Sequence, residues 1–216
     1  MPPSIDLFGL VISEPTTTLT DYLITLVASY FGVCVRHSAA DRAGRLWGHA
    51  FLFIALAAFL GGTSHGFASY LGAAGNIFLW KSTVYAIGLS MLCAVAGTID
   101  NCPLDPHVAR LLHSVNVAAF VIYAAWMVGH DSFRYVIYHY VPAMLAIALL
   151  HAWLFIRHRK PGSRWVIAGV VVTLLGAVIQ QSGFSVHRQF NNNDLYHVIQ
   201  IVGLYLLFRG VSAYGR

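Results

Sequence analysis

The sequence contains seven apolar runs, each long enough to cross a lipid bilayer as a helix. A spanning helix needs about 20 mostly apolar residues, and polar or Gly- and Pro-bearing stretches separate the runs. The runs cover residues 18–35, 46–64, 77–98, 109–129, 134–156, 165–185 and 194–213. Because they occupy most of the 216 residues, we expect a single transmembrane domain over residues 1–216, an all-α bundle of seven transmembrane helices.

The composition excludes several other classes of protein. Hydrophobic residues make up 58% of the chain and charged residues 10%, whereas soluble domains are about 45–50% apolar and about 25% charged. The 13 Lys and Arg residues are scattered among the apolar runs, so they do not form the basic face that binds nucleic acid. Cys34, Cys93 and Cys102 have neither metal-finger nor redox spacing. Residues 1–14 carry no Lys or Arg, which is unlike a secretory signal.

The distribution of positive charge predicts the orientation of the bundle. Cytoplasmic loops of membrane proteins are enriched in Lys and Arg. With the N-terminus outside and the C-terminus cytoplasmic, ten basic residues fall on the cytoplasmic side and only Arg134 and Arg188 on the other. The ten are Arg36, Arg42, Arg45, Arg110, Arg157, Arg159, Lys160, Arg164, Arg209 and Arg216. We therefore expect a multi-pass protein with its N-terminus outside, in the plasma (inner) membrane of a prokaryote.

With this orientation, polar residues from several runs collect at the outer end of the bundle. Intramembrane polar groups are costly and often mark function. The residues concerned are His65 at the end of the second run, Asn76 and Lys81 at the start of the third, His139 in the fifth, His187 in the following loop, and Asn193, Asp194 and His197 at the start of the seventh. This convergence predicts a site, although Lys81 also fits a residue whose ammonium group reaches the membrane surface.

The start of the seventh run has the clearest local geometry. Asn193 and Asp194 lie four and three residues before His197, so all three share one helix face. Carboxylate and imidazole both suit Zn²⁺, which keeps three protein ligands and an open position at catalytic sites. An equally physical alternative is that an Asn caps the helix and Asp194 occupies its first turn, where the helix dipole favours a carboxylate.

Three stretches resemble the alkaline ceramidase family and the wider CREST group of seven-span membrane hydrolases. They are SEPTTTLTDYLITLV from Ser13, LGGTSHGFAS from Leu60 and NDLYHVIQIVGLYLLFRG from Asn193. The resemblance implies zinc-dependent hydrolysis of a lipid amide such as ceramide, with His65 and His197 as zinc ligands. Glu14 matches a calcium-ligating glutamate of that family, but the acidic segment that precedes it there is missing, which argues against calcium.

The chain departs from the family at three functional positions. Asn193 stands in place of a zinc-binding histidine, Gly61 in place of a serine, and Asn76 in place of a catalytic aspartate. An amide forms hydrogen bonds but is not a base at neutral pH. If zinc binds, Asp194 is the candidate for the third ligand and for the catalytic base, and His139 or His187 could approach from the same side.

Three functional hypotheses follow from the sequence. The first is a metal-dependent lipid hydrolase that uses His65, His197 and Asp194, with a membrane lipid as substrate. The second is a member of the same group that has lost catalysis and binds a lipid or another amphiphile between its helices. The third is a transporter, against which the absence of an internal repeat argues.

Overall fold

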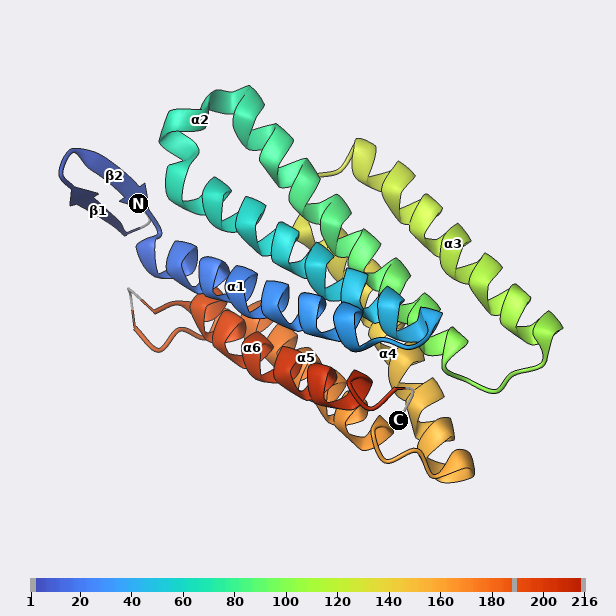
Figure 1. The fold of residues 1–216 in the computed structure, drawn as a ribbon. Helices are drawn as coiled ribbons and strands as arrows, with labels where there is room; N and C mark the ends of the chain where they lie inside the picture. The colour runs from blue at the N-terminus through green and yellow to red at the C-terminus, as the bar shows by residue number, and fades with distance from the viewer. Residues whose placement is uncertain (1–2, 188–189, 215–216) are drawn as a thin grey trace.

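A computed structural model describes residues 3–187 and 190–214 and shows a bundle of long helices (Figure 1). The described residues form six helices: α1 (Pro15–Ser38), α2 (Arg42–Asp100), α3 (Pro106–Val128), α4 (Phe133–His158), α5 (Ser163–Ser182) and α6 (Asn192–Val211). Every predicted apolar run falls within or within three residues of one of these helices, and α2 contains two of them. The all-α prediction is confirmed, apart from a hairpin before α1.

That hairpin joins strands β1 (Ser4–Leu7) and β2 (Leu10–Ser13) in antiparallel register. Phe8 and Gly9 connect the strands, and both have positive φ, 56° and 86°. Positive φ at both central residues is the geometry of the two-residue turn that matches strand twist. The sequence analysis did not predict these strands.

Helix α2 folds back on itself. A straight helix of 59 residues would be roughly 88 Å long, about three times the thickness of the hydrocarbon core of a bilayer. The backbone leaves helical geometry at Phe67 and at Gly72, where φ is +63°, a conformation that glycine adopts without steric cost. The two arms, 42–66 and 73–100, then run side by side (Figure 1), and Ser90 Oγ donates to Ala50 O across them at 2.8 Å.

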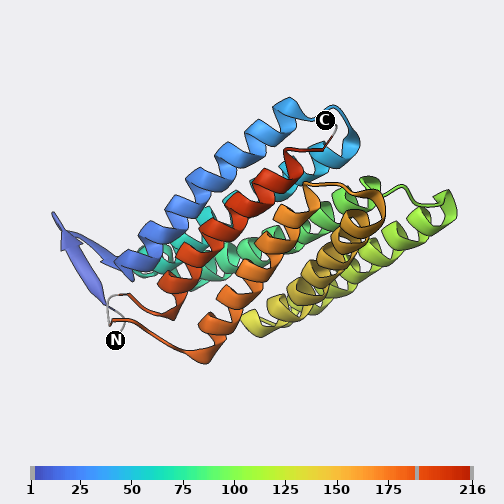
Figure 2. The same ribbon diagram turned by 90° about the horizontal axis from the view of Figure 1, so that it is seen from below.

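Helix α6 lies between α1 and α5, with α4 and α3 beyond α5 (Figure 2). The contact between α5 and α6 depends on glycines. A Cβ on Gly169 would lie 2.9 Å from Gly203 O, and one on Gly210 would lie 2.8 Å from Val166 N. Small residues at helix contacts let backbones approach closely in membranes. Helix α6 also packs on α1, which brings the first turns of α1 and α6, far apart in the sequence, to the same end of the bundle.

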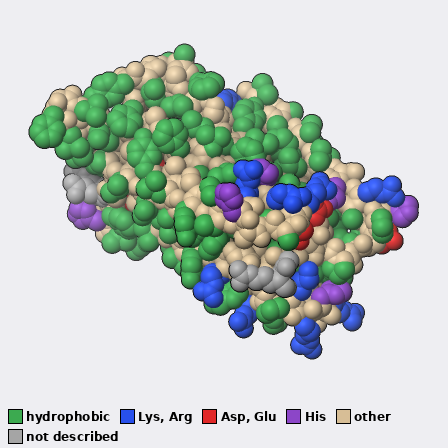
Figure 3. Space-filling view, in the orientation of Figure 1, with side chains coloured by type: hydrophobic (Ala, Val, Ile, Leu, Met, Phe, Trp, Pro, Cys, Tyr) green, Lys and Arg blue, Asp and Glu red, His purple; other side chains and the backbone are tan. Residues whose placement is uncertain are grey.

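The outer surface is that of a membrane-embedded bundle. Helices α1 to α5 are each long and apolar enough to cross a membrane. Large apolar side chains such as Leu26, Ile122 and Leu149 are about 70% exposed, and apolar surface dominates Figure 3, where Lys and Arg gather toward the end that carries the C-terminus. Of the basic residues counted for the orientation, Arg188 and Arg216 lie outside the described residues.

Candidate functional site

A cavity of about 320 Å³ lies where the N-terminal halves of α1 and α6 meet both arms of α2 and the end of α5. Its lining combines apolar residues with a set of polar side chains from four helices. The polar members are Asp21, His65, Thr83, Gln180, Gln181, Asn192, Asn193, His197 and Gln200. We refer to it below as the polar cavity. His65 and His197, the two histidines expected to converge, both line it.

His197 is held in one orientation by α1. Its Nδ1 lies 2.9 Å from Thr20 Oγ1, and that hydroxyl is 3.0 Å from the carbonyl oxygens of Thr16 and Thr17. Because the hydroxyl proton is donated to one of these carbonyls, its oxygen accepts from Nδ1–H, and this network assigns the lone pair to Nε2. Metal-bound histidines are commonly oriented in the same way, by a hydrogen bond from the other ring nitrogen.

Nε2 of His197 faces a carboxylate. Asp21 Oδ1 lies 3.5 Å away, which is longer than the 2.7–2.9 Å usual for a charge-assisted hydrogen bond. Asp21 is 6% exposed and His197 8%, so water screens neither of them. Two atoms that carry lone pairs therefore face each other at the wall of the cavity, an arrangement that a proton or a cation between them stabilises.

His65 has a different carboxylate partner. Its Nδ1 lies 3.3 Å from Oε2 of Glu14, the residue that precedes α1. Interaction with the His65 imidazole holds the pKa of Glu14 below its ordinary value, although partial burial acts in the opposite direction. The contact joins the start of α1 to the end of the first arm of α2.

Asp194 has the capping role that the sequence left open. Its Oδ2 accepts from Asn191 N at 2.7 Å, and Asn191 in turn caps the first turn of α6, which forms a capping box. Its Oδ1 accepts from Thr17 Oγ1, also at 2.7 Å. The side chain is fully buried and is not part of the cavity lining. Neighbouring Asn193 does line the cavity, where its Oδ1 accepts from Gln180 Nε2 at 3.0 Å.

Asn76 and Lys81 lie outside the polar cavity. Asn76 Nδ2 donates to Ala68 O at 2.9 Å and so bridges the bend of α2. Lys81 Nζ donates to backbone carbonyl oxygens at and beyond the end of α3, among them that of His130 at 3.1 Å, and pairs with Asp131. A cation placed there stabilises the C-terminal end of a helix, so Lys81 secures α3 to α2.

The other two predicted site residues are also elsewhere. His139 lies in a separate groove, where its ring stacks on Tyr123 with centroids 4.4 Å apart. His187 exchanges backbone hydrogen bonds with Phe190, beside residues 188–189, which the structure does not describe.

The donor set fits zinc only in part. Within residues 3–187 and 190–214, no group of three or more His, Cys, Asp or Glu side chains is placed to hold a metal ion. His197 and Asp21 supply two donors of the kinds that zinc prefers, whereas a catalytic zinc keeps three protein ligands.

Sequence reasoning missed the contribution of the first helix. Thr17, Thr20 and Asp21 lie at i, i+3 and i+4 and therefore on one helix face. An intramembrane aspartate is a functional candidate by default, so Asp21 could have been found by the same test that singled out His197.

Comparisons with curated proteins and with solved structures find nothing similar to this chain. A comparison with family models matches residues 16–216, which include all six helices except the first residue of α1. The chain therefore belongs to the Family of unknown function (DUF6962).

Proposed function

We propose that this protein is a membrane protein that binds the neutral polar part of a lipid or similar amphiphile in the polar cavity. The observation that carries the proposal is a pair of amide side chains that line the cavity, Gln181 and Gln200. Within the described part of the chain, neither amide has a hydrogen-bond partner; Gln200 is half-buried in the cavity wall and Gln181 is exposed at the end of α5. Both are therefore free to bind a ligand.

The chemistry of the lining favours a neutral ligand. An amide offers donors and an acceptor, so it suits hydroxyl and amide groups equally well. Of the carboxylates around the cavity, Glu14 pairs with His65, and Asp21 lies against His197 Nε2 at 3.5 Å. A ceramide, which carries hydroxyl groups and an amide beside two hydrocarbon chains, has the required chemistry, and it is the lipid that the resemblance to ceramidases implies.

In this proposal the chain crosses the membrane seven times, once with each arm of α2 and once with each of the other five helices. The N-terminus is outside and the C-terminus cytoplasmic, as the excess of basic residues at the C-terminal end favours. The polar cavity then opens near the outer surface, where lipid head groups lie. Gln200 is eight residues into α6, roughly 12 Å along the helix from Asn192.

Substituting Gln200 with leucine is expected to weaken ceramide binding about tenfold. The change removes one ligand hydrogen bond and leaves its partner on the ligand unpaired inside the cavity, a loss of about 1.5 kcal/mol. The measurement is a binding isotherm for short-chain ceramide with purified protein in detergent. Val202→Leu, at an exposed position two residues further along α6, is the control and should bind like the wild type. Equal affinity of Q200L and the wild type, or no binding by the wild type, would overturn the proposal.

A second candidate function is metal-dependent hydrolysis of the same class of lipid. The separation of His197 Nε2 and Asp21 Oδ1 favours it, because two atoms that each lie about 2.0–2.1 Å from a tetrahedral zinc are themselves about 3.4 Å apart. His197 and Asp21 would hold the ion, and His65 lines the same cavity. A bound zinc supplies a Lewis acid for an amide carbonyl and lowers the pKa of a water molecule to about 7.

Samples of purified protein from the ceramide-binding experiment also distinguish binding from hydrolysis. Stoichiometric zinc by elemental analysis, together with fatty acid released from the ceramide and lost in D21N, would establish hydrolysis. Bound ceramide that is recovered intact from zinc-supplemented protein would leave binding as the function.

A further inference from the structure

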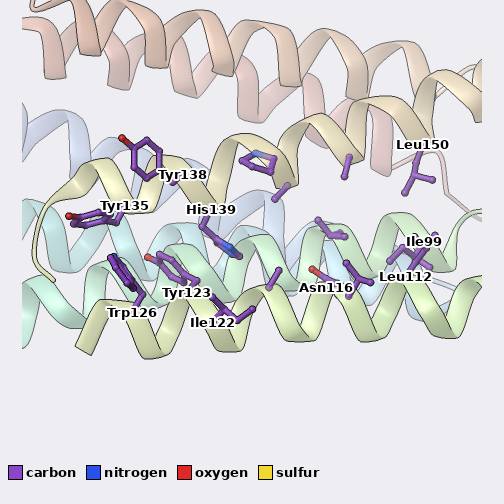
Figure 4. A pocket seen from close by; sticks show the side chains of 16 residues that line it. Ile99, Leu112, Asn116, Ile122, Tyr123, Trp126, Tyr135, Tyr138, His139 and Leu150 are labelled. Atoms are coloured by element: carbon purple, nitrogen blue, oxygen red, sulfur yellow. The ribbon is translucent and has the colours of Figure 1, made fainter. Parts of the chain in front are cut away.

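A second and larger hollow lies on the opposite side of the bundle from α1 and α6. It is a groove of about 730 Å³ between α3, α4 and the second arm of α2 (Figure 4). The groove and the polar cavity share no lining residue. Most of the groove is apolar, with residues such as Leu112, Ile122 and Leu150 along its walls.

The groove lies beside α3, a helix that is largely exposed and is joined to α2 by polar contacts, among them His113 Nε2 with Asp100 Oδ1 at 2.8 Å. Of its 23 residues, only Tyr123 and Met127 are buried, and at that end Lys81 Nζ donates to the carbonyl oxygens of Met127, Val128 and His130. Along α3 the groove extends from Trp126 to Leu112, which is about 21 Å. The half-thickness of the hydrocarbon core is only about 15 Å, so the groove has room for an extended chain from one leaflet.

One polar atom in this groove lacks a partner. His139 Nε2 is buried and has no hydrogen bond within the described residues, while its ring stacks on Tyr123 at an interplanar angle of 14°. Of the other polar side chains that line the groove, Tyr123 Oη donates to Val84 O at 2.8 Å and Asn116 Nδ2 to Leu92 O at 3.0 Å, while Tyr138 is exposed. A buried nitrogen that has no hydrogen-bond partner requires an explanation.

We propose that the groove holds one acyl chain of a diacyl membrane lipid, with His139 Nε2–H donating to the carbonyl oxygen of the lipid ester. His139 is six residues into α4, about 9 Å from its start at Phe133. Trp126, Tyr135 and Tyr138 line the same end of the groove (Figure 4), and aromatic side chains gather at the level of lipid head groups. The imidazole therefore lies just below the head groups, at the depth of the ester carbonyls.

The apolar part of the site is tested by filling the groove. Native mass spectrometry of the protein transferred from dioleoyl phosphatidylcholine nanodiscs should detect one retained lipid per wild-type chain. Ala119→Phe, which projects a ring from the groove wall, should reduce retention at least tenfold. Ala118→Phe, at an exposed position next to it that does not line the groove, should retain the lipid. Equal retention by A119F and A118F, or a dimer in place of the lipid complex, would overturn the proposal.

The polar part is tested with a lipid that lacks the carbonyl. The wild type should retain dioleoyl phosphatidylcholine about fivefold better than its di-ether analogue, as expected for one net hydrogen bond. His139→Phe keeps a stacking ring but removes the donor, so the preference should disappear while both lipids still bind. Thermal unfolding of each variant by circular dichroism verifies that it is folded. An unchanged ester preference in H139F would exclude the assigned hydrogen bond.

Discussion

Replacing Gly169 with leucine should lower the stability of the bundle by about 3 kcal/mol. A Cβ at this position would lie 2.9 Å from both Gly203 O and Leu207 N of α6. These are backbone atoms of a neighbouring helix, so only separation of α5 from α6 relieves the overlap. Because α6 carries His197 and Gln200, the polar cavity should open and ceramide binding should fall as well.

Circular dichroism in detergent measures this effect as an apparent unfolding temperature, which should drop by about 6–12 °C for a chain of this size. Gly129→Leu is the matched control, since a Cβ there meets nothing within 4 Å and φ is −99°. The two variants should differ clearly. Similar unfolding temperatures for G169L and G129L would contradict the close packing of α5 on α6.

Asp194→Ala is the second change with a large expected effect, a loss of about 2–4 kcal/mol. The substitution removes the acceptor for Asn191 N and leaves the buried Thr17 hydroxyl without its partner. A lost helix cap costs typically about 1 kcal/mol, and a buried group left unsatisfied adds about 1–3 kcal/mol.

Asp105→Ala separates the two contributions. Asp105 also accepts hydrogen bonds from the first turn of its helix, from His107 N and Val108 N, but it lies in an exposed position. We expect D105A to lose only the capping contribution of about 1 kcal/mol. The unfolding temperature of D194A should therefore fall two to four times as far as that of D105A. If the two fall equally, the contact between Thr17 and Asp194 does not stabilise the fold.

The helices were predictable because membrane length and apolar composition leave few alternatives. The bend of α2 shows the limit of that reasoning. Two runs with a Gly-bearing connection were expected to be separate helices and correspond to the two arms of α2, but the connection itself is also largely helical and departs from helical geometry only at Phe67 and Gly72. The hairpin before α1 was missed because its strands, of four residues each, are too short to show a periodic pattern.

The sequence predicted which polar residues lie at the same level of the bundle. It did not predict which way each side chain faces, because packing against neighbouring helices decides that. His65 and His197 lie at the same end of the bundle, and both line the polar cavity. Asp194 occupies the same turn as Asn193, but its hydrogen bond from Thr17 directs it away from the cavity. That bond joins residues 177 positions apart in the sequence, and no local pattern reveals which helix will pack against α6.

The most direct test of the proposed function is the position of a bound ceramide. Wild-type protein is incubated with a ceramide that carries a diazirine beside its amide group, and the cross-linked peptides are mapped by mass spectrometry. The account predicts cross-links within residues 192–200 of α6 and at the end of the first arm of α2, and it predicts that unlabelled ceramide competes for them. Cross-links that are confined to α3 and α4, or that unlabelled ceramide does not reduce, would contradict it.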